Sequence, residues 1–427
     1  MKNNWIKNFD NLALSSNRRT VLEIINTGLG AIDTEKVMRD SILLEGGMLK
    51  IKNQSFNLSK FKKIKVVGFG KAAPKAALVL ENILGDRISE GAVIGLEKVD
   101  TKIIKSFVGT HPRPSLENLE ASRKIYDIAD CANADELLIA IVSGGGSALL
   151  CYPESEYKQG VALYNSFLGA GQTIIEMNTV RKHLSLLKGG GLAKLAYPAT
   201  VVGLIFSDIP GDKFENVASG PTYKDITTVE DAKKIILENN LGDYELIETP
   251  KDEKYFEKVK NFILVSGDTV LQVMQAKAQE LGFSVEIASI ALGAEMDQTL
   301  EEIFSRKKSN QVVLSAGEPR IKVTDKNGKG GRNLHLTLTA LGKNLIDDDS
   351  VFSSFASDGL DDSDYAGAIA DKLTIKKMKE LNLDAANYLN HFDSYNFFQK
   401  TEDMIITGPT GANVSDLMVL LTKKNGR

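Results

Sequence analysis

Residues 176–222, EMNTVRKHLSLLKGGGLAKLAYPATVVGLIFSDIPGDKFENVASGPT, combine a cationic turn, two glycine turns and one apolar run. The run Val201–Phe206 is continuously apolar, which is typical of a strand buried on both faces of a parallel sheet. It ends in Ser207-Asp208 and then Gly211-Asp212. Ligands of open α/β sheets bind beyond the carboxyl ends of the strands. We therefore expect Asp208 to face a ligand.

A cationic cluster precedes this strand, with Arg181, Lys182, His183 and Lys188 beside three consecutive glycines. The whole chain has a net charge of -4, so it offers no general basic surface for nucleic acid or a membrane. Anion binding must then come from local clusters, and we predict that Arg181 and Lys188 contact substrate or nucleotide. The alternative is a solvated basic face of a helix.

A second apolar run, Ile64–Val67, leads into Gly68-Phe69-Gly70-Lys71 and a helix-like segment. A strand, a glycine turn and a helix start together suit a phosphate group. The pattern also resembles a dinucleotide fingerprint, but no strand ending in an acidic residue follows at the required distance. We predict that Gly68, Gly70 and Lys71 contact a ligand; the alternative is that Lys71 is a surface lysine.

A third run, Leu137–Val142, ends in Ser143-Gly144-Gly145-Gly146-Ser147. Consecutive glycines let backbone N–H groups converge on an anion without a side chain in the way. We predict an anion site here, against the alternative of a merely flexible turn. His111, in the HPRP segment at 111–114, is interpreted as structural rather than as a ligand contact.

In the C-terminal half, acidic residues follow the predicted strands. Gln311–Leu314 leads to Glu318, and Gly330-Gly331-Arg332-Asn333 precedes a helix-like segment. Phe352–Ala356 leads to Asp358, and further acidic residues follow at Asp361, Asp362 and Asp364. Such carboxylates can hold Mg²⁺ together with waters. An acidic solvated loop is the alternative.

The length of 427 residues favours two α/β domains. We place the boundary in the polar, charged stretch between Leu241 and Asn261, giving domains 1–245 and 258–427, with Phe262–Val265 opening a βαβ unit in the second. The N-terminus lacks a signal-like apolar core and no apolar run is of spanning length, so a cytosolic protein is expected. The two cysteines are too few for a disulfide framework or a cysteine metal site.

Several strand-end turns, isolated cations and nearby carboxylates fit phosphoryl transfer, in which catalysis is largely positioning and charge neutralisation. Neither a Walker A sequence nor an H-E-x-x-H or G-x-S-x-G motif occurs. Hydride transfer needs a convincing nicotinamide fold, and acyl transfer needs a serine beside a base. The residues therefore point to a nucleotide-dependent kinase.

Eight segments together resemble the class II glycerate kinase family, whose C-terminal part is called the MOFRL domain. They are GFGKAA (68–73), HPRP (111–114), SGGGSALL (143–150), EMNTVRKHLSLLKGG (176–190), SDIPGD (207–212), ASGPT (218–222), GKGGRN (328–333) and TGPTGANVSDL (407–417). The resemblance covers nearly the whole chain in the expected order. It implies ATP-dependent phosphorylation of D-glycerate at the 2-hydroxyl by a cytosolic enzyme. It also implies two α/β domains, the larger N-terminal one Rossmann-like, with a cleft between them.

By the same resemblance, Lys71 takes the place of the lysine in the family's GKAA turn and Arg332 that of the arginine in its GGRN turn. Glu318 and Asp358 match its GGEP and TDG segments. With Asp358 orienting or deprotonating the 2-hydroxyl, Lys71, Arg332 and Asp358 are the expected catalytic residues. The remaining expected contacts to substrate or nucleotide are Gly68, Gly70, Ser143, Gly144, Gly145, Gly146, Ser147, Arg181, Lys188, Asp208, Glu318 and Asn333.

The expected cofactors are ATP and Mg²⁺, with Asp208 and Asp358 as metal ligands. The carboxylate of glycerate is expected either at the turn 143–146 or at Arg181. The partners are D-glycerate and ATP, with neither nucleic acid nor membrane, and a homodimer is the candidate assembly.

The chain departs from the family pattern at Leu334, His335 and Asp361, which puts the acceptor in question more than the fold. Two other functions stay open. One is a hydroxypyruvate reductase, and the other is a non-catalytic protein that binds a sugar acid or nucleotide.

Overall fold

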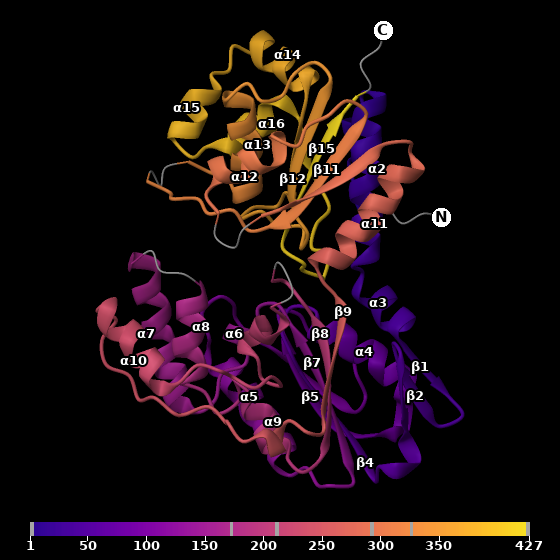
Figure 1. The fold of residues 1–427 in the computed structure, drawn as a ribbon, viewed down its shortest axis with the longest axis vertical. Coiled ribbons are helices and arrows are strands. Elements are labelled where there is room, and N and C mark those ends of the chain that lie inside the picture. The colour runs from indigo at the N-terminus through magenta and orange to yellow at the C-terminus, as the bar shows by residue number, and fades with distance from the viewer. Residues whose placement is uncertain (1–3, 171–173, 210–212, 291–293, 325–327, 424–427) are drawn as a thin grey trace. The chain divides into compact units, whose positions relative to one another are not determined.

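The computed structural model describes residues 4–170, 174–209, 213–290, 294–324 and 328–423. The chain divides into two compact units (Figure 1). Residues 34–265 form what we call the parallel-sheet unit, and residues 1–33 together with 266–427 form the mixed-sheet unit. Among the described residues, no helix combines the length and apolar character needed to cross a membrane.

A six-stranded parallel sheet forms the centre of the parallel-sheet unit, in the order β6-β5-β4-β7-β8-β9. The strands are β4 (Lys63–Phe69), β5 (Ile88–Gly95), β6 (Ile104–Val108), β7 (Glu136–Ser143), β8 (Thr200–Phe206) and β9 (Val259–Val265). Numbered along the chain, the order is 3-2-1-4-5-6, so the direction of winding reverses between β4 and β7. In doubly wound sheets, ligands bind at this reversal, beyond the carboxyl ends of the strands.

Helices cover both faces of this sheet, with α5 and α9 on one side and α3 and α4 on the other (Figure 1). The two central strands β4 and β7 are almost wholly buried, which explains their unbroken apolar runs. The remaining elements of the unit are α3 (Thr34–Ser41), β1 (Ile42–Glu45), β2 (Met48–Ile51), β3 (Gln54–Asn57), α4 (Ala73–Leu84), α5 (Leu116–Asp130), α6 (Gly146–Leu149), α7 (Glu154–Ala170), α8 (Ile174–Lys182), α9 (Gly191–Ala196) and α10 (Val229–Glu238).

The mixed-sheet unit is built on a second six-stranded sheet, in the order β10-β11-β15-β12-β13-β14. The last strand of the chain, β15, is inserted at its centre and runs antiparallel to both neighbours, β11 and β12. The strands are β10 (Ser284–Ser289), β11 (Gln311–Gly317), β12 (Ser350–Ala356), β13 (Gly367–Ala370), β14 (Met404–Ile405) and β15 (Asp416–Thr422). The start of β15 therefore lies between the ends of β11 and β12.

Helices α2 and α11 pack together on one face of the mixed sheet, and α12, α13 and α16 cover the other (Figure 1). Leu334, Leu336, Leu338 and Phe398 are among the residues that fill the core on this second face. The helices of the unit are α1 (Phe9–Leu12), α2 (Ser16–Ala31), α11 (Gly267–Glu280), α12 (Met296–Phe304), α13 (Arg332–Gly342), α14 (Lys372–Glu380), α15 (Ala385–Asn390) and α16 (Ser394–Thr401).

The α/β class and the two-unit organisation are confirmed, but the units do not divide where the sequence analysis placed them. Residues 1–33 join the C-terminal half rather than the N-terminal one, and the division falls between Val265 and Ser266 instead of between Leu241 and Asn261. The reason is strand pairing. Strand β9 pairs with β8 in the parallel sheet, whereas β10 pairs with β11 in the other sheet. The predicted βαβ unit beginning at Phe262 is therefore wrong.

Candidate active site

Three predicted turns meet at one edge of the parallel sheet. Strand β4 pairs with β7 up to Phe69 and Val142, and β7 pairs with β8 up to Ser143 and Phe206. Because the strands are parallel, the turns that follow them emerge side by side at the reversal point. This brings Lys71, the glycine turn after Ser143, and Asp208 to the same edge. Residues 210–212 of the third turn lie outside the described ranges.

The first turn is fixed to the second by its backbone. The amides of Gly70, Lys71 and Ala72 donate respectively to Ile94 O at 3.1 Å, Gly144 O at 2.8 Å and Ser143 Oγ at 3.1 Å. These donors are therefore used within the protein. Gly70 has φ +115°, and a Cβ there would lie 2.2 Å from Ser143 Oγ, so only glycine fits. Gly68 lies inside β4, where a Cβ would press on Val93, so its role is packing.

The second turn offers backbone donors instead. In the described part of the chain, neither the Gly144 nor the Gly145 amide donates to another protein group. A Cβ at Gly145 would lie 3.3 Å from both Lys71 Cγ and His111 Cδ2. Two unused amides beside a lysine stem and an imidazole suit an anion. His111, interpreted from the sequence as structural, is exposed and lies at this turn.

Gly144 is held against Asp208, and we expect substitution there to be costly. A Cβ at Gly144 would lie 2.1 Å from Asp208 Oδ2. Gly144→Ala should therefore displace that carboxylate and lower the free energy of unfolding by about 1–3 kcal/mol. Gly160→Ala is the matched control. Gly160 lies in helix α7, and a Cβ built on it would have no heavy atom within 4 Å. This substitution should stabilise by about 0.5–1 kcal/mol. Urea unfolding measures both, and equal effects would contradict this description of the turn.

Two site residues, Asn178 and Ser219, were not predicted from the sequence. Ser147 Oγ and Ser219 Oγ share a hydrogen bond of 2.9 Å, and Ser219 Oγ donates to Asn178 Oδ1 at 3.3 Å. Ala218, Ser219 and Gly220 all have left-handed φ values, 51°, 61° and 65°. Left-handed backbone at residues other than glycine costs about 1–2 kcal/mol each and is concentrated at functional sites. The signals in the sequence were the ASGPT segment for Ser219 and the EMNTVRKHLSLLKGG segment for Asn178.

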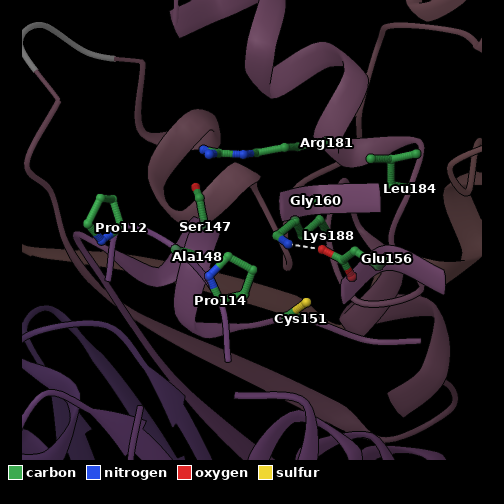
Figure 2. Close-up of a pocket in the computed structure, with 10 residues that line it drawn as sticks. All are labelled: Pro112, Pro114, Ser147, Ala148, Cys151, Glu156, Gly160, Arg181, Leu184 and Lys188. Carbon is green, nitrogen blue, oxygen red and sulfur yellow. Dashed lines mark hydrogen bonds and ion pairs between the residues drawn. The ribbon is translucent and has the colours of Figure 1, made fainter. Parts of the chain in front are cut away.

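The cationic cluster is dispersed by the fold. Lys182 Nζ forms a buried ion pair with Asp225 at 3.1 Å, and the ring of buried His183 faces Thr179 O at 2.9 Å. Lys188 forms a buried ion pair with Glu156, drawn in Figure 2. Lys188, which we predicted to contact a ligand, therefore pairs with Glu156 in this structure. Arg181 lines the same pocket as Lys188.

In the mixed-sheet unit, three carboxylates are brought to one edge of the sheet by β15. Its first residue, Asp416, pairs with Gly317 of β11 and Ala356 of β12. Glu318 follows Gly317, and Asp358 lies two residues beyond Ala356. The sequence analysis missed Asp416 because strand order is not visible in apolar periodicity. Its signal was the SDL at the end of the TGPTGANVSDL segment.

Arg332, the first residue of α13, is held by two of these carboxylates. Its Nη1 lies 3.2 Å from Glu318 Oε2, and its Nε lies 3.2 Å from Asp416 Oδ2. Burial alone lowers the pKa of Arg332, but Asp416 and Glu318 outweigh it and raise the pKa above its ordinary value. Burial raises the pKa of Asp416, against the opposing effect of Arg332. Arg332 is therefore a permanent cation beside one buried and one half-exposed carboxyl group.

Asp361 and Asn333 form hydrogen bonds at the start of α13. Asp361 accepts from the amide of Asn333 at 3.0 Å, the side chain of Asn333 at 3.0 Å and the amide of Leu334 at 2.9 Å. Asn333 Oδ1 also accepts from Ser354 Oγ at 2.5 Å. Burial raises the pKa of Asp361 to about 6, although these donors lower it. The acidic loop is thus partly a helix cap.

His335 makes stability depend on pH. Its ring stacks on Phe392 at 5.1 Å between centroids, and its buried Nδ1 has no partner among the described residues. Burial lowers its pKa from 6.5 to about 4. Between these values only the unfolded chain takes up the proton, so stability is full above pH 6.5 and falls by about 3 kcal/mol as pH drops to 4. His335→Leu should flatten this dependence in urea titrations, whereas exposed His391→Leu should not.

No group of three or more histidine, cysteine, aspartate or glutamate side chains arranged for a metal ion occurs among the residues that the structure describes. Asp208 and Asp358, the two predicted metal ligands, belong to different units. Asp208 lies against the glycine turn, and Asp358 Oδ1 accepts from the Leu360 amide at 3.2 Å. A Mg²⁺ site that relies on one protein carboxylate and phosphate oxygens remains compatible with this arrangement.

Known proteins resemble this chain over nearly its whole length. Residues 20–248 match the family model described as domain of unknown function DUF4147, and residues 311–416 match that of the MOFRL family. A glycerate 2-kinase of Pyrococcus horikoshii is 31% identical, over 96% of this chain and 98% of that protein. The crystal structure of a glycerate kinase from Thermotoga maritima superposes with a TM-score of 0.80 at 30% identity, over 95% of this chain and 99% of that chain.

Proposed function

The chain belongs to the class II glycerate kinase family, and from that premise we propose that it transfers the terminal phosphoryl group of ATP to the 2-hydroxyl of D-glycerate. The products are 2-phosphoglycerate and ADP. One structural observation supports this most strongly. Lys71 lies beside the unused amides of Gly144 and Gly145 at the reversal point of a parallel sheet. A cation and two fixed donors at that place suit a phosphate or carboxylate.

The roles of the charged residues follow from the chemistry of phosphoryl transfer. Charge on the moving group is neutralised by cations, which we assign to Lys71 and Arg332. Asp358 orients the 2-hydroxyl and accepts its proton. Glu318 and Asp416 fix the guanidinium of Arg332, so that its direction is set before substrate arrives.

Mg²⁺ would be held by carboxylate oxygens of Asp208 or Asp358 together with phosphate oxygens of ATP. Mg²⁺ commonly takes only one or two protein carboxylates in nucleotide sites, and Asp208 and Asp358 each follow the end of a strand. When bound, it neutralises charge on the phosphates. The protein's own part is to present the carboxylate and the amides of the glycine turn.

The structure offers no support for the reductase alternative. A dinucleotide site at Gly68–Ala73 would need backbone donors for the pyrophosphate. The amides of Gly70, Lys71 and Ala72 already donate within the protein. Departures at Leu334 and His335 also have a packing explanation, because Leu334 is buried in the core and His335 stacks on Phe392. They give no reason to favour a non-catalytic binding protein.

Release of ADP on addition of each acceptor tests the proposal. We expect MgATP to be consumed with D-glycerate and to remain intact with glycerol or with no acceptor. NADH should not be oxidised with hydroxypyruvate. ATP hydrolysis that is independent of D-glycerate, or oxidation of NADH by hydroxypyruvate, would contradict the proposed function.

A further inference from the structure

A small pocket lies in the parallel-sheet unit beside the glycine turn (Figure 2). Its space is about 310 Å³, counting the part open to solvent. The pocket is small, so it suits only a ligand of few atoms. Ser147 joins it to the glycine turn, and its hydroxyl points toward the guanidinium of Arg181. The lining residues are Pro112, Pro114, Ser147, Ala148, Cys151, Glu156, Gly160, Arg181, Leu184 and Lys188.

The charges in this pocket do not cancel. Two cations, Arg181 and Lys188, face one anion, Glu156, which leaves one positive charge. Lys188 and Glu156 are both buried and neutralise each other as an ion pair. Glu156 is held further by the Tyr152 amide, which donates to it at 2.8 Å. The surplus charge therefore belongs to Arg181.

Arg181 carries that charge without a direct partner. In the described ranges, its guanidinium makes neither a hydrogen bond nor an ion pair within 4 Å. Burial lowers the pKa of Arg181, and Glu156 only partly opposes this. Arg181 is half-buried, and an anionic ligand in the pocket would give its guanidinium a charged partner.

We propose that Arg181 binds the carboxylate of the glycerate acceptor in this pocket, which makes the pocket the subsite that selects short monoanionic hydroxy acids. The inference rests on the proposed kinase function. It assigns the carboxylate to Arg181 and leaves the amides of Gly144 and Gly145 for phosphate oxygens. A guanidinium matches a carboxylate through two parallel N–H donors.

The pocket is a poor site for the phosphates of ATP. A triphosphate carries several negative charges, whereas the surplus here is one positive charge. Pro112, Pro114 and Leu184 contribute an apolar part of the lining, which fits the carbon chain of a small acid better than a phosphate. One carboxylate balances the charge.

The assignment is tested by comparing KM for a charged and an uncharged acceptor. D-Glycerate and its neutral amide, glyceramide, have nearly the same shape. The unaltered protein should favour D-glycerate, and Arg181→Met should raise KM for D-glycerate roughly 10- to 100-fold while leaving KM for glyceramide and for ATP within about twofold. Arg181→Lys keeps the charge but loses the paired donors, so an intermediate KM is expected. Arg39→Met, at an exposed arginine of the same unit, is the control.

A steric variant tests the same pocket without touching its charges. A Cβ at Gly160 would have no heavy atom within 4 Å, so a larger side chain fits the helix and enters open space. Gly160→Leu should raise KM for D-glycerate with little change in KM for ATP. If Arg181→Met does not fold, Arg181→Lys and Gly160→Leu decide the matter, and an unchanged KM for D-glycerate in both would overturn the assignment.

The outcomes separate this inference from the proposed function. Active protein whose preference for D-glycerate over glyceramide survives in Arg181→Met overturns the Arg181 subsite and leaves the kinase proposal standing. If the unaltered protein phosphorylates no D-glycerate, the kinase proposal fails, and calorimetric titration with D-glycerate still tests the subsite. Binding that is lost in Arg181→Met supports it, and binding that is unaffected overturns it.

Discussion

The Lys71→Met variant is expected to lose roughly 100-fold in kcat/KM for D-glycerate phosphorylation while unfolding at nearly the same urea concentration. Methionine keeps the length of the side chain and removes its charge. The backbone of this turn is already held by Gly144 O and Ser143 Oγ, so the turn should keep its shape. The loss then reports the missing cation at the glycine turn, where transferring oxygens need neutralisation.

Lys50→Met is the matched control for Lys71→Met. Lys50 is an exposed residue of β2 in the same unit, and its substitution should leave both kinetics and stability unchanged. Steady-state kinetics with D-glycerate and ATP varied in turn provide the measurement. If Lys71→Met retains kcat/KM within about threefold, Lys71 does not act on the phosphates.

The second large effect concerns stability. Arg18 of α2 is fully buried and donates to Asp371 Oδ1 and to Asp403 Oδ1, each at 2.7 Å, and to Thr374 Oγ1 at 2.9 Å. Removing a buried cation leaves two buried carboxylates uncompensated. We expect Arg18→Met to lower the free energy of unfolding by about 3–5 kcal/mol, measured by urea titration.

Arg19→Met controls for the position, because Arg19 is the exposed neighbour of Arg18 in the same helix. Its effect should stay within about 0.5 kcal/mol. Adding Asp371→Asn and Asp403→Asn to Arg18→Met should recover part of the lost stability, since the uncompensated charges are then removed. A loss below about 1 kcal/mol in Arg18→Met would show that the three side chains do not form the ion-paired cluster described.

Local sequence patterns were sufficient to predict a single strand and the turn that follows it. The apolar runs Ile64–Val67, Leu137–Val142 and Val201–Phe206 lie in strands β4, β7 and β8, and the turns after these strands meet at one edge of a parallel sheet. That follows because burial on both faces demands an unbroken apolar run. The lysine of the first turn and the glycines of the second could therefore each be placed at the end of a strand from the sequence, whereas the pairing of β4 with β7 brings them together.

Pairing between distant segments could not be predicted in this way. Apolar periodicity does not name a strand's neighbour, so β9 was assigned to the wrong sheet and Asp416 was not seen as the partner of Arg332. For the same reason, Lys188 was predicted to contact a ligand, although it pairs with Glu156, which lies 32 residues earlier in the sequence. A charged residue shows its type in the sequence, but only the fold shows its counter-ion.

³¹P NMR of the purified protein with MgATP and D-glycerate tests the central claim most directly. The phosphorus of 2-phosphoglycerate couples to one proton on C2, whereas that of 3-phosphoglycerate couples to two protons on C3. We predict a new doublet that grows as ATP is converted to ADP. A triplet would place the phosphoryl group on the 3-hydroxyl, and an unchanged ATP spectrum would contradict the kinase function itself.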